Sequence, residues 1–342
     1  MKYFMHILSL LVAFIMVGCG GSSSSSTGNA EVNSNYAYVT DGTSMKVIDI
    51  TTPSTPVLKG SVMTGSSFKV SVSDGYAYVS EFAPADPYVS IIDIGTPTAP
   101  TLAAPVSKGT VFGRVSDMYI EGNVAYISDE YRGIHVVDIG NGVFNPQALE
   151  GADAMAVTKL GMELYLIHQG SAYGVQKYNV TTPYVLAAGV INTVDVNAFS
   201  YPAPTRTHHS LMENDGTHII VANVQDEKLK KLSSSLGLIL EVDIGGFATA
   251  LAVSDNYAYV TMHAGVNAPL LVSDDAVKMI DLSSMTVVDT KVLSSASGVA
   301  VFDGHVYVTD STGLHIYDVS SGSMSLVANF ASGKGNAIAL GK

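Results

Sequence analysis

Charged residues and cysteine are both scarce in this sequence, and each shortage excludes a class of protein. Charged residues make up 14% of the chain, with 17 Lys and Arg against 30 Asp and Glu, and the net charge is -13. Because phosphate backbones are bound by clustered Lys and Arg, a nucleic-acid partner is disfavoured. Cys19 is the only cysteine, so no disulfide can form within the chain.

Helical patterns and catalytic signatures are missing as well. Beyond the N-terminal region, no apolar run approaches the roughly 18 residues of a membrane-spanning helix. The chain has no His-Glu-x-x-His zinc motif, no phosphate loop and no Gly-x-Ser-x-Gly elbow. Glycine is abundant, with 32 residues in a chain that is 47% hydrophobic. This composition favours short strands and tight turns in one large all-β domain.

The N-terminal residues have the layout of an export signal. Lys2 provides a basic start, an apolar run covers residues 7–17, and the run ends in Val17-Gly18-Cys19. This ending resembles the bacterial lipobox, in which the Cys is lipidated and becomes the first residue. We therefore expect a lipoprotein signal peptide over residues 1–18 and lipidation at Cys19.

A short polar segment separates this signal from the rest of the chain. Residues 19–30 are rich in Ser and Gly, a composition that stays solvated and flexible, so we expect a tether there. No Asp follows Cys19. In the lipoprotein resemblance this absence favours the outer membrane or the cell surface over the inner membrane.

From residue 35 onward the chain repeats a short phrase. The phrase contains Tyr-Ala-Tyr-Val or a variant of it, then a Val-Ile-Asp-Ile stretch and often Thr-Pro. One anchor position recurs in every copy, at Tyr38, Tyr78, Tyr126, Tyr165, Ile220, Tyr259 and Tyr307. Successive anchors lie 39 to 55 residues apart, close to the 40–50 residues of one four-stranded blade. Residues 31–342 are therefore predicted to form an all-β, seven-bladed β-propeller.

Each copy divides into four strands, of which the first copy lacks one. The innermost strand precedes the Tyr-Ala-Tyr-Val strand, as over residues 68–73, and the outermost follows Thr-Pro, as over residues 56–62. Nothing comparable precedes Tyr38. The C-terminal residues 336–340 have the pattern of the missing strand, so we expect them to close the ring inside the first blade.

The repeats resemble the LVIVD repeat of bacterial and archaeal surface proteins. The matching words are Lys46-Val47-Ile48-Asp49-Ile50, Ser90-Ile91-Ile92-Asp93-Ile94 and His135-Val136-Val137-Asp138-Ile139, and the resemblance covers about residues 35–330. It implies an exported β-propeller and no catalytic residues. The fifth copy departs from the pattern, because Arg206 and a His pair precede an Asn-Asp-Gly turn there. In that copy the chain is more similar to lactonase-like propellers.

Aspartates recur at two positions of the repeat. One set ends the Val-Ile-Asp-Ile strand: Asp49, Asp93, Asp138, Asp243, Asp281 and Asp318. A second set of residues ends the Tyr-Ala-Tyr-Val strand: Asp41, Glu81, Asp129, His168, Asn223, Met262 and Asp310. A carboxylate beside a tight turn accepts backbone N–H bonds, so we interpret both sets as turn caps. An acidic ring that attracts cations is the alternative for the second set, and a metal site is the alternative for the first.

The innermost strands contain the candidate ligand site. Counting back twelve residues from each anchor after the first gives Ser66, Arg114, Asp153, His208, Phe247 and Ser295. Three consecutive copies thus carry a charged or titratable residue at one position, with Arg206 and His209 nearby. A buried charge is unfavourable unless it is paired. A structural Arg–Asp pair beside a satisfied His is one explanation, and a site in the central channel for a small anion or, with His209, a divalent metal is the other.

These observations leave three functions open. The leading hypothesis is a lipid-anchored, monomeric binding module of the cell envelope, which needs no cofactor and catalyses no reaction. Its partner is a protein, a glycan or a small ligand of unknown identity. The alternative is a periplasmic or surface enzyme of lactonase-like or metal-dependent type that uses the channel. A structural role in a surface layer is the third.

Overall fold

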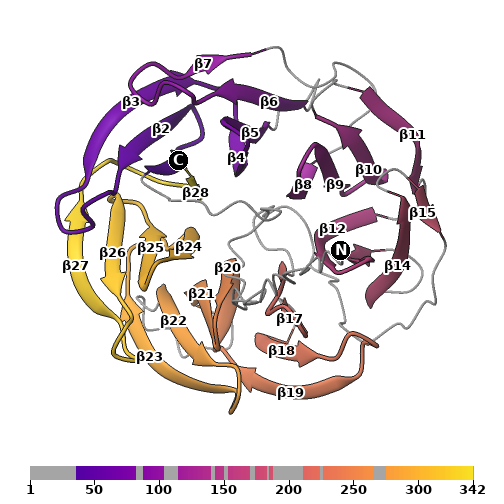
Figure 1. Cartoon of the computed structure of the whole chain (residues 1–342). Helices are drawn as coiled ribbons and strands as arrows, with labels where there is room; N and C mark the ends of the chain where they lie inside the picture. Colours follow the sequence, from indigo (N-terminus) through magenta and orange to yellow (C-terminus); the bar gives the residue numbers. More distant parts are fainter. Residues whose placement is uncertain are drawn as a thin grey trace, which may run out of the picture.

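The computed structural model is a ring of seven four-stranded antiparallel sheets, which are the blades of a β-propeller (Figure 1). It describes residues 36–81, 88–103, 115–139, 143–149, 153–169, 174–182, 185–187, 211–223, 226–264 and 275–341. Every regular element in this part of the chain is a strand. No helix there has the length and apolar character needed to cross a membrane. The predicted fold is confirmed.

Each blade runs from an inner strand at the channel to an outer strand at the rim. Blade 1 consists of β28 (Ala337–Gly341), β1 (Tyr36–Thr40), β2 (Ser44–Asp49) and β3 (Val57–Met63), and blade 2 of β4 (Ser67–Ser73), β5 (Tyr76–Glu81), β6 (Tyr88–Asp93) and β7 (Thr101–Leu102). Blade 3 consists of β8 (Val115–Glu121), β9 (Val124–Asp129), β10 (Gly133–Asp138) and β11 (Val143–Leu149), and blade 4 of β12 (Asp153–Leu160), β13 (Glu163–Gln169), β14 (Gly174–Thr182) and β15 (Val185–Ala187). Blade 5 consists of β16 (Leu211–Asn214), β17 (Ile219–Asn223), β18 (Lys228–Leu232) and β19 (Leu238–Asp243). Blade 6 consists of β20 (Gly246–Ser254), β21 (Tyr257–Ala264), β22 (Ala276–Asp281) and β23 (Thr286–Val292). Blade 7 consists of β24 (Gly298–Phe302), β25 (His305–Thr309), β26 (Leu314–Asp318) and β27 (Ser325–Phe330).

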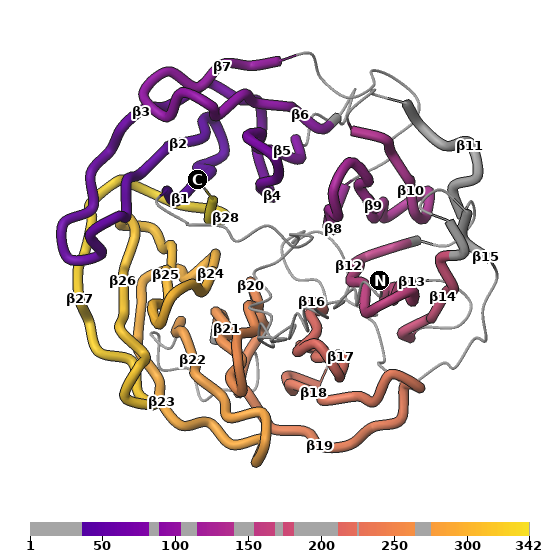
Figure 2. The backbone as a smooth tube through the Cα atoms, in the orientation of Figure 1, coloured from indigo at the N-terminus to yellow at the C-terminus, as the bar shows by residue number. Residues whose placement is uncertain are grey.

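The C-terminal strand completes the first blade, as the sequence predicts. β28 pairs antiparallel with β1, with Tyr36 opposite Gly341 and Thr40 opposite Ala337. Figure 2 shows the C-terminus next to β1 at the inner side of the ring. A Cβ atom on Gly341 would lie 2.6 Å from Val72 Cγ1, so the second blade leaves no room for a side chain there. The two ends of the propeller chain therefore share one sheet.

The turn between the inner strand and the second strand has one length throughout the ring. The residue paired with each anchor lies seven positions before it in all six blades where this hairpin is continuous: Ser71–Tyr78, Tyr119–Tyr126, Thr158–Tyr165, Glu213–Ile220, Ala252–Tyr259 and Ala300–Tyr307. The left-handed backbone at Asp74 (φ 49°) and Gly75 (φ 80°) shows how the tight turn is made. Because the turns match, counting back from an anchor finds equivalent positions of the inner strands.

The hydrophobic core consists of separate clusters, each between neighbouring blades. One cluster joins Tyr38 and Val47 of blade 1 to Val70 and Val79 of blade 2. The other clusters repeat this arrangement around the ring. Both faces of a blade are therefore covered, which explains why the strands are apolar on both sides. The inner edges of the blades are left to line the channel.

Candidate functional site

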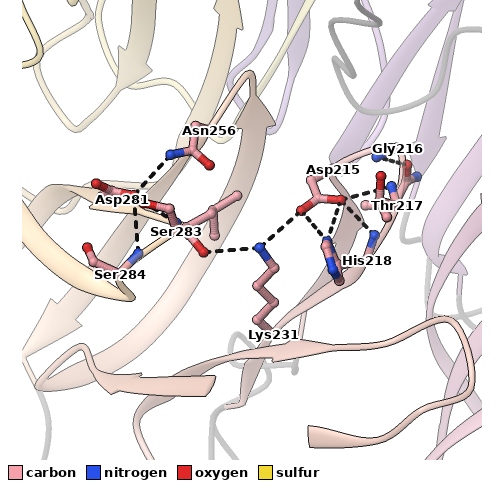
Figure 3. A network of polar contacts seen from close by, with 11 residues as sticks. Asp215, Gly216, Thr217, His218, Lys231, Asn256, Asp281, Ser283 and Ser284 are labelled. Carbon is pink, nitrogen blue, oxygen red and sulfur yellow. Dashed lines mark hydrogen bonds and ion pairs between the residues drawn. The ribbon is translucent and has the colours of Figure 1, made fainter. Parts of the chain in front are cut away.

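The aspartates that end the third strand of the blades are turn caps. Five of them accept a hydrogen bond from the backbone N–H two residues further on: Asp49, Asp93, Asp243, Asp281 and Asp318. Figure 3 shows Asp281 with the N–H groups of Ser283 and Ser284 and the amide of Asn256. The structural interpretation is confirmed for these five aspartates.

The Asn-Asp-Gly turn of the fifth blade is also structural. Asp215 accepts hydrogen bonds from the backbone N–H groups of Thr217 (2.9 Å) and His218 (2.6 Å). Lys231 lies 3.6 Å from the Asp215 carboxylate and donates a hydrogen bond to the carbonyl of Leu282 in blade 6 (3.1 Å; Figure 3). This turn therefore fastens blade 5 to blade 6.

The three aspartates that end the second strand have the same capping role, whereas Glu81 accepts hydrogen bonds from the N–H of Gly65 and the hydroxyl of Ser90. Asp41 accepts hydrogen bonds from the backbone N–H groups of Thr43 and Ser44 and forms an ion pair with Lys46 at 3.0 Å. Burial disfavours the charged form of Asp41, but these hydrogen bonds and the ammonium of Lys46 outweigh it and hold the pKa well below its usual range. Two other aspartates of this set cap their turns and pair with a histidine: Asp129 with His135 and Asp310 with His315. These carboxylates are already partnered and do not form an open acidic ring.

The position twelve residues before the anchor lies at the start of the inner strand. Asp153 is the first residue of β12, and its backbone pairs with Gln169. The equivalent residues Ser66 and Ser295 are exposed and precede β4 and β24. The side chain of Asp153 lies outside the described residues, as do four other predicted site residues and the lipidation candidate: Arg114, Arg206, His208, His209 and Cys19.

A repeated polar contact joins the inner strands of neighbouring blades, and we call it the blade latch. The latch residue lies ten positions before the anchor in blades 3, 6 and 7, and in blade 1 the equivalent residue directly precedes β28. It lies where the inner strand bulges or begins, and its side chain donates to a backbone carbonyl of the next blade. The described latches are Ser116 to Ala154 O (2.9 Å), Thr249 to Ala296 O (2.9 Å), Ser297 to Gly335 O and Asn336 to Ser67 O (3.4 Å). Three of the donors also bond to a hydroxyl of the second strand in their own blade. The latch therefore satisfies polar groups at each blade boundary where it occurs.

Two blades have an apolar residue in place of the latch donor. Phe68 occupies the bulge of β4, and Met155 occupies the bulge of β12. Neither side chain can donate a hydrogen bond through O–H or N–H. Both are only partly buried, and both line the central channel. The repeat thus departs from its own pattern in blades 2 and 4, at the channel wall.

The channel contains a cavity of about 630 Å³. All seven inner strands contribute to its wall, with Phe68, Met155 and Leu211 forming an apolar portion. Hydroxyl groups line another portion, and the exposed Lys334 lies at its edge. The volume suits a small molecule.

One ion pair crosses from blade 2 to blade 3 in the wall of this cavity. Lys69 Nζ lies 2.7 Å from Asp117 Oδ1, and the other carboxylate oxygen accepts a hydrogen bond from the N–H of Val157 in blade 4 (3.1 Å). The two side chains are 27% and 11% exposed. Burial disfavours the ammonium of Lys69, but the charge and hydrogen bond of Asp117 outweigh burial and raise the Lys69 pKa. The pair therefore joins three blades on the side of the ring where latch donors are missing.

Glu213 is a third ionisable group in this region. It lies in β16 of blade 5 and is 9% exposed. Burial raises the pKa of Glu213 to about 8; the charge of Lys69 opposes this increase, and the charge of Asp117 adds to it. Its carboxyl group has no hydrogen-bond or ion-pair partner in the described part of the chain. The folded protein therefore favours the protonated form of Glu213.

These three residues were not among the predicted site residues, although the sequence contains their signal. Lys69 and Asp117 lie nine residues before Tyr78 and Tyr126, and Glu213 lies seven before Ile220. The equivalent residues in blades 6 and 7 are alanine or glycine: Ala250, Ala252, Gly298 and Ala300. Counting back nine and seven residues as well as twelve would have found them. Among the described residues, no group of three or more His, Cys, Asp or Glu side chains is placed to hold a metal ion.

Comparison with known proteins identifies the repeat. The profile of the family described as LVIVD repeat matches residues 25–64, 65–107, 112–143, 245–266 and 294–331, which together cover about half of the chain. No curated protein sequence matches significantly.

Solved structures share the fold at low sequence identity. The periplasmic gluconolactonase PpgL of Pseudomonas aeruginosa has a TM-score of 0.64 at 12% identity, over 90% of this chain and 99% of that one. AztD of Citrobacter koseri has a TM-score of 0.59 at 12% identity, over 90% of this chain and 98% of that one. A protein of unknown function from Desulfotomaculum acetoxidans has a TM-score of 0.62 at 13% identity, over 90% of this chain and 99% of that one. At such identities the likeness extends to the fold alone.

Proposed function

The chain belongs to the LVIVD-repeat family, and from that premise we propose that it is a lipid-anchored protein of the cell envelope that binds a small ligand in its central channel without transforming it. One observation carries the binding role. The blade latch is replaced by Phe68 and Met155 where the wall of a cavity of about 630 Å³ also carries an ion pair. Departures of a repeat from its own pattern mark positions used for something other than folding.

The Lys69–Asp117 ion pair in the cavity wall supports binding over covalent catalysis. A lysine becomes a nucleophile when its pKa falls, whereas the pKa of Lys69 is raised and its ammonium is held by Asp117. Asp117 in turn has both oxygens engaged, by Lys69 and by the N–H of Val157. These groups are fixed in place and suit the recognition of a ligand.

A second candidate, a lactonase-like hydrolase, has one observation in its favour. A carboxyl group with a pKa of about 8, such as Glu213, can act as a general acid or base near neutral pH. A pH-stat assay with glucono-1,5-lactone tests it. We expect no hydrolysis above the uncatalysed rate. Hydrolysis by the wild-type protein that the Glu213→Gln variant lacks would favour the enzyme.

The anchor is tested by fractionation and intact mass. We expect the wild-type protein in the membrane fraction, with an acylated N-terminal Cys19, because Lys2, the apolar run over 7–17 and Val17-Gly18-Cys19 form a lipoprotein signal. The Cys19→Ser variant should be released from the membrane. A mature species that begins at Met1 or carries no acyl mass would contradict lipidation.

The binding role is tested by blocking the mouth of the cavity. Ser311 is exposed and lines the cavity, so Ser311→Trp narrows its entrance. Ser321, exposed in the turn between β26 and β27, provides the matched control Ser321→Trp. Native mass spectrometry of detergent-extracted protein should detect a bound small molecule in wild type and control, and little in Ser311→Trp. Equal occupancy in all three would place the ligand elsewhere, and no bound molecule in any would count against the proposal.

A further inference from the structure

The charged side chains in the wall of the cavity do not cancel. Lys69 and Asp117 neutralise each other at 2.7 Å. Lys334, exposed at the edge of the cavity, has no ion pair or hydrogen bond within the described part of the chain. The other ten lysines that the structure describes each have such a partner. One positive charge is therefore left over, and it lies at the cavity.

The backbone around Lys334 is bonded to residues that carry hydroxyl groups at the same cavity. The N–H of Gly335 donates to the carbonyl of Asp310 (2.9 Å), and the N–H of Ser311 donates to the carbonyl of the residue before Ser295 (2.9 Å). Ser311 and Ser295 are exposed and line the cavity, as Lys334 does. These three residues thus belong to one bonded frame, and we call their side chains the donor rim.

The carboxylates on this frame are already partnered. Asp310 accepts hydrogen bonds from the backbone N–H and the hydroxyl of Thr312 and pairs with His315 at 2.9 Å. Asp275, whose carbonyl accepts the N–H of the residue two before Ser295, holds His263 at 2.7 Å. Neither carboxylate pairs with Lys334. The ammonium of Lys334 is therefore available to a ligand.

A ligand with one negative charge matches this arrangement. A cation would meet Lys334 at the edge of the cavity and could use Asp117 only by breaking its ion pair with Lys69. A phosphate monoester carries close to two negative charges at neutral pH, which exceeds the one positive charge left over. A carboxylate carries one charge, and its two oxygens accept hydrogen bonds from ammonium and hydroxyl groups.

The segment that carries Lys334 also leads to the apolar wall. The side chain of Asn336 donates to the carbonyl of Ser67 (3.4 Å), which is the residue before Phe68. Two residues of chain span at most about 7 Å, so Lys334 and Phe68 lie on neighbouring parts of one wall. A molecule with a charged head and an apolar body can therefore contact both.

We propose that the channel cavity binds the anion of a small carboxylic acid with an apolar body, whose carboxylate is held at the donor rim. The inference rests on the proposed binding function and specifies its ligand class. Phe68, Met155 and Leu211 provide the apolar wall on which the body packs. Because the chain has a net charge of -13, its overall field does not attract anions, and the apolar contacts must provide much of the affinity.

Isothermal titration with probes that differ only in their head group tests the proposal on the full-length protein in a non-ionic detergent. The probes are 4-phenylbutyrate, 4-phenylbutan-1-ol and 4-phenylbutylamine at pH 7, and acetate serves as a carboxylate without an apolar body. Heats measured with detergent alone are subtracted. We expect 4-phenylbutyrate to bind at least tenfold more tightly than each of the other three.

Variants at Lys334 locate the carboxylate. Lys334→Gln removes the charge that is left over and should weaken 4-phenylbutyrate at least tenfold without changing the binding of the alcohol. Lys334→Arg keeps the charge and should retain most of the binding. The matched control Lys59→Gln, which removes one lysine charge from the outer strand of blade 1, should change neither probe. Because Lys334 is exposed, the melting temperature of its variants should stay that of the wild type.

The outcomes separate this inference from the function beneath it. Equal or tighter binding of the alcohol or the amine, blocked by Ser311→Trp, would leave a channel-binding protein and overturn the carboxylate. Binding of 4-phenylbutyrate that Lys334→Gln leaves unchanged, or that Lys59→Gln weakens as much, would overturn the donor rim. Acetate binding as tight as that of 4-phenylbutyrate would overturn the apolar body. If no probe binds at millimolar concentration and the extracted protein carries no small molecule, both proposals fail.

Discussion

The inner strands of blades 6, 7 and 1 differ from those of blades 2 to 5, although their backbones have the same register. On the first side, the positions nine and seven residues before the anchor are occupied by Ala250 and Ala252 in blade 6 and by Gly298 and Ala300 in blade 7. In blade 1 the residues that pair equivalently, with Thr40 and Tyr38, are Ala337 and Ala339 of β28. Every blade there has a latch donor. On the second side the same two positions include Lys69, Asp117, Tyr119 and Glu213.

This comparison teaches that one repeated framework serves two purposes. Small residues let the first side close tightly, as at Gly298, where a Cβ atom would lie 2.6 Å from Thr309 Oγ1. On the second side apolar residues replace two of the latch donors, and this side contributes Phe68, Met155 and the Lys69–Asp117 ion pair to the wall of the cavity. The first side closes the ring with small residues and latches, and the second side carries the ion pair and the apolar replacements on which the proposed binding role rests.

The largest effect is expected from removing the strand that closes the first side. Deleting residues 333–342 removes β28 and two latches, to Gly335 and from Asn336, and exposes the unpaired edge of β1. We expect the cooperative thermal transition to be lost or shifted down by more than 10 °C. A chain that ends at Gly341 is the control. An unchanged melting temperature in the deletion would contradict closure by β28.

The next largest effect is expected on the second side. Lys69→Met leaves Asp117 without its cation in a nearly buried position and should lower the free energy of unfolding by about 2–4 kcal/mol. Adding Asp117→Asn removes the stranded charge and should recover much of the loss. Urea denaturation of the single and double variants measures the coupling. Additive losses would show that the pair is energetically unimportant.

A smaller effect is expected from a single latch. Ser116→Ala removes hydrogen bonds to Ser128 and to the carbonyl of Ala154 and should lower the free energy of unfolding by about 1–2 kcal/mol. The control Ser66→Ala changes an exposed serine just before β4, where we expect a change below about 0.5 kcal/mol. Equal changes at the two positions would show that the latch adds nothing to stability.

The most gradual effect is a dependence on pH, because the change in stability is spread over several pH units. Because the pKa of Glu213 is about 8 in the folded protein and ordinary in the unfolded chain, its contribution to stability is complete below the unfolded pKa and is lost as pH rises toward 8. The loss is at most about 1.4 kcal/mol per pH unit across that window. In melting curves from pH 5 to 9, Glu213→Gln should flatten this decline relative to wild type. Parallel curves would mean that Glu213 is solvated or paired.

The fold could be predicted almost completely from the sequence, because its evidence is repeated. Anchors such as Tyr38 and Tyr307 recur in the same context, and a missing strand at one end is matched by a surplus strand at the other. The turns between inner and second strands keep one length, so counting positions back from the anchors found equivalent residues.

The site was harder to predict because of the bulges in the inner strands. Bulges at Phe68, Ser116 and Met155 insert one residue and reverse the alternation of side chains between the strand start and its middle. A bulge leaves no mark in a single sequence, so the face to which Lys69 or Asp117 points could not be assigned. The raised pKa of Glu213 depends on burial and on charges from other blades, which only the folded ring brings together.

The pairing of β28 with β1 also determines when the protein can finish folding. β1 is made first and its inner partner is made last, so the first blade stays open until the whole chain is available. Contacts between distant parts of a chain are the slowest to form, because loop-closure entropy must be overcome before they gain energy. A ribosome that still holds the residues of β28 therefore holds an open ring with an unpaired strand at its first blade. Completion of the ring is a checkpoint that only a chain containing β28 can pass.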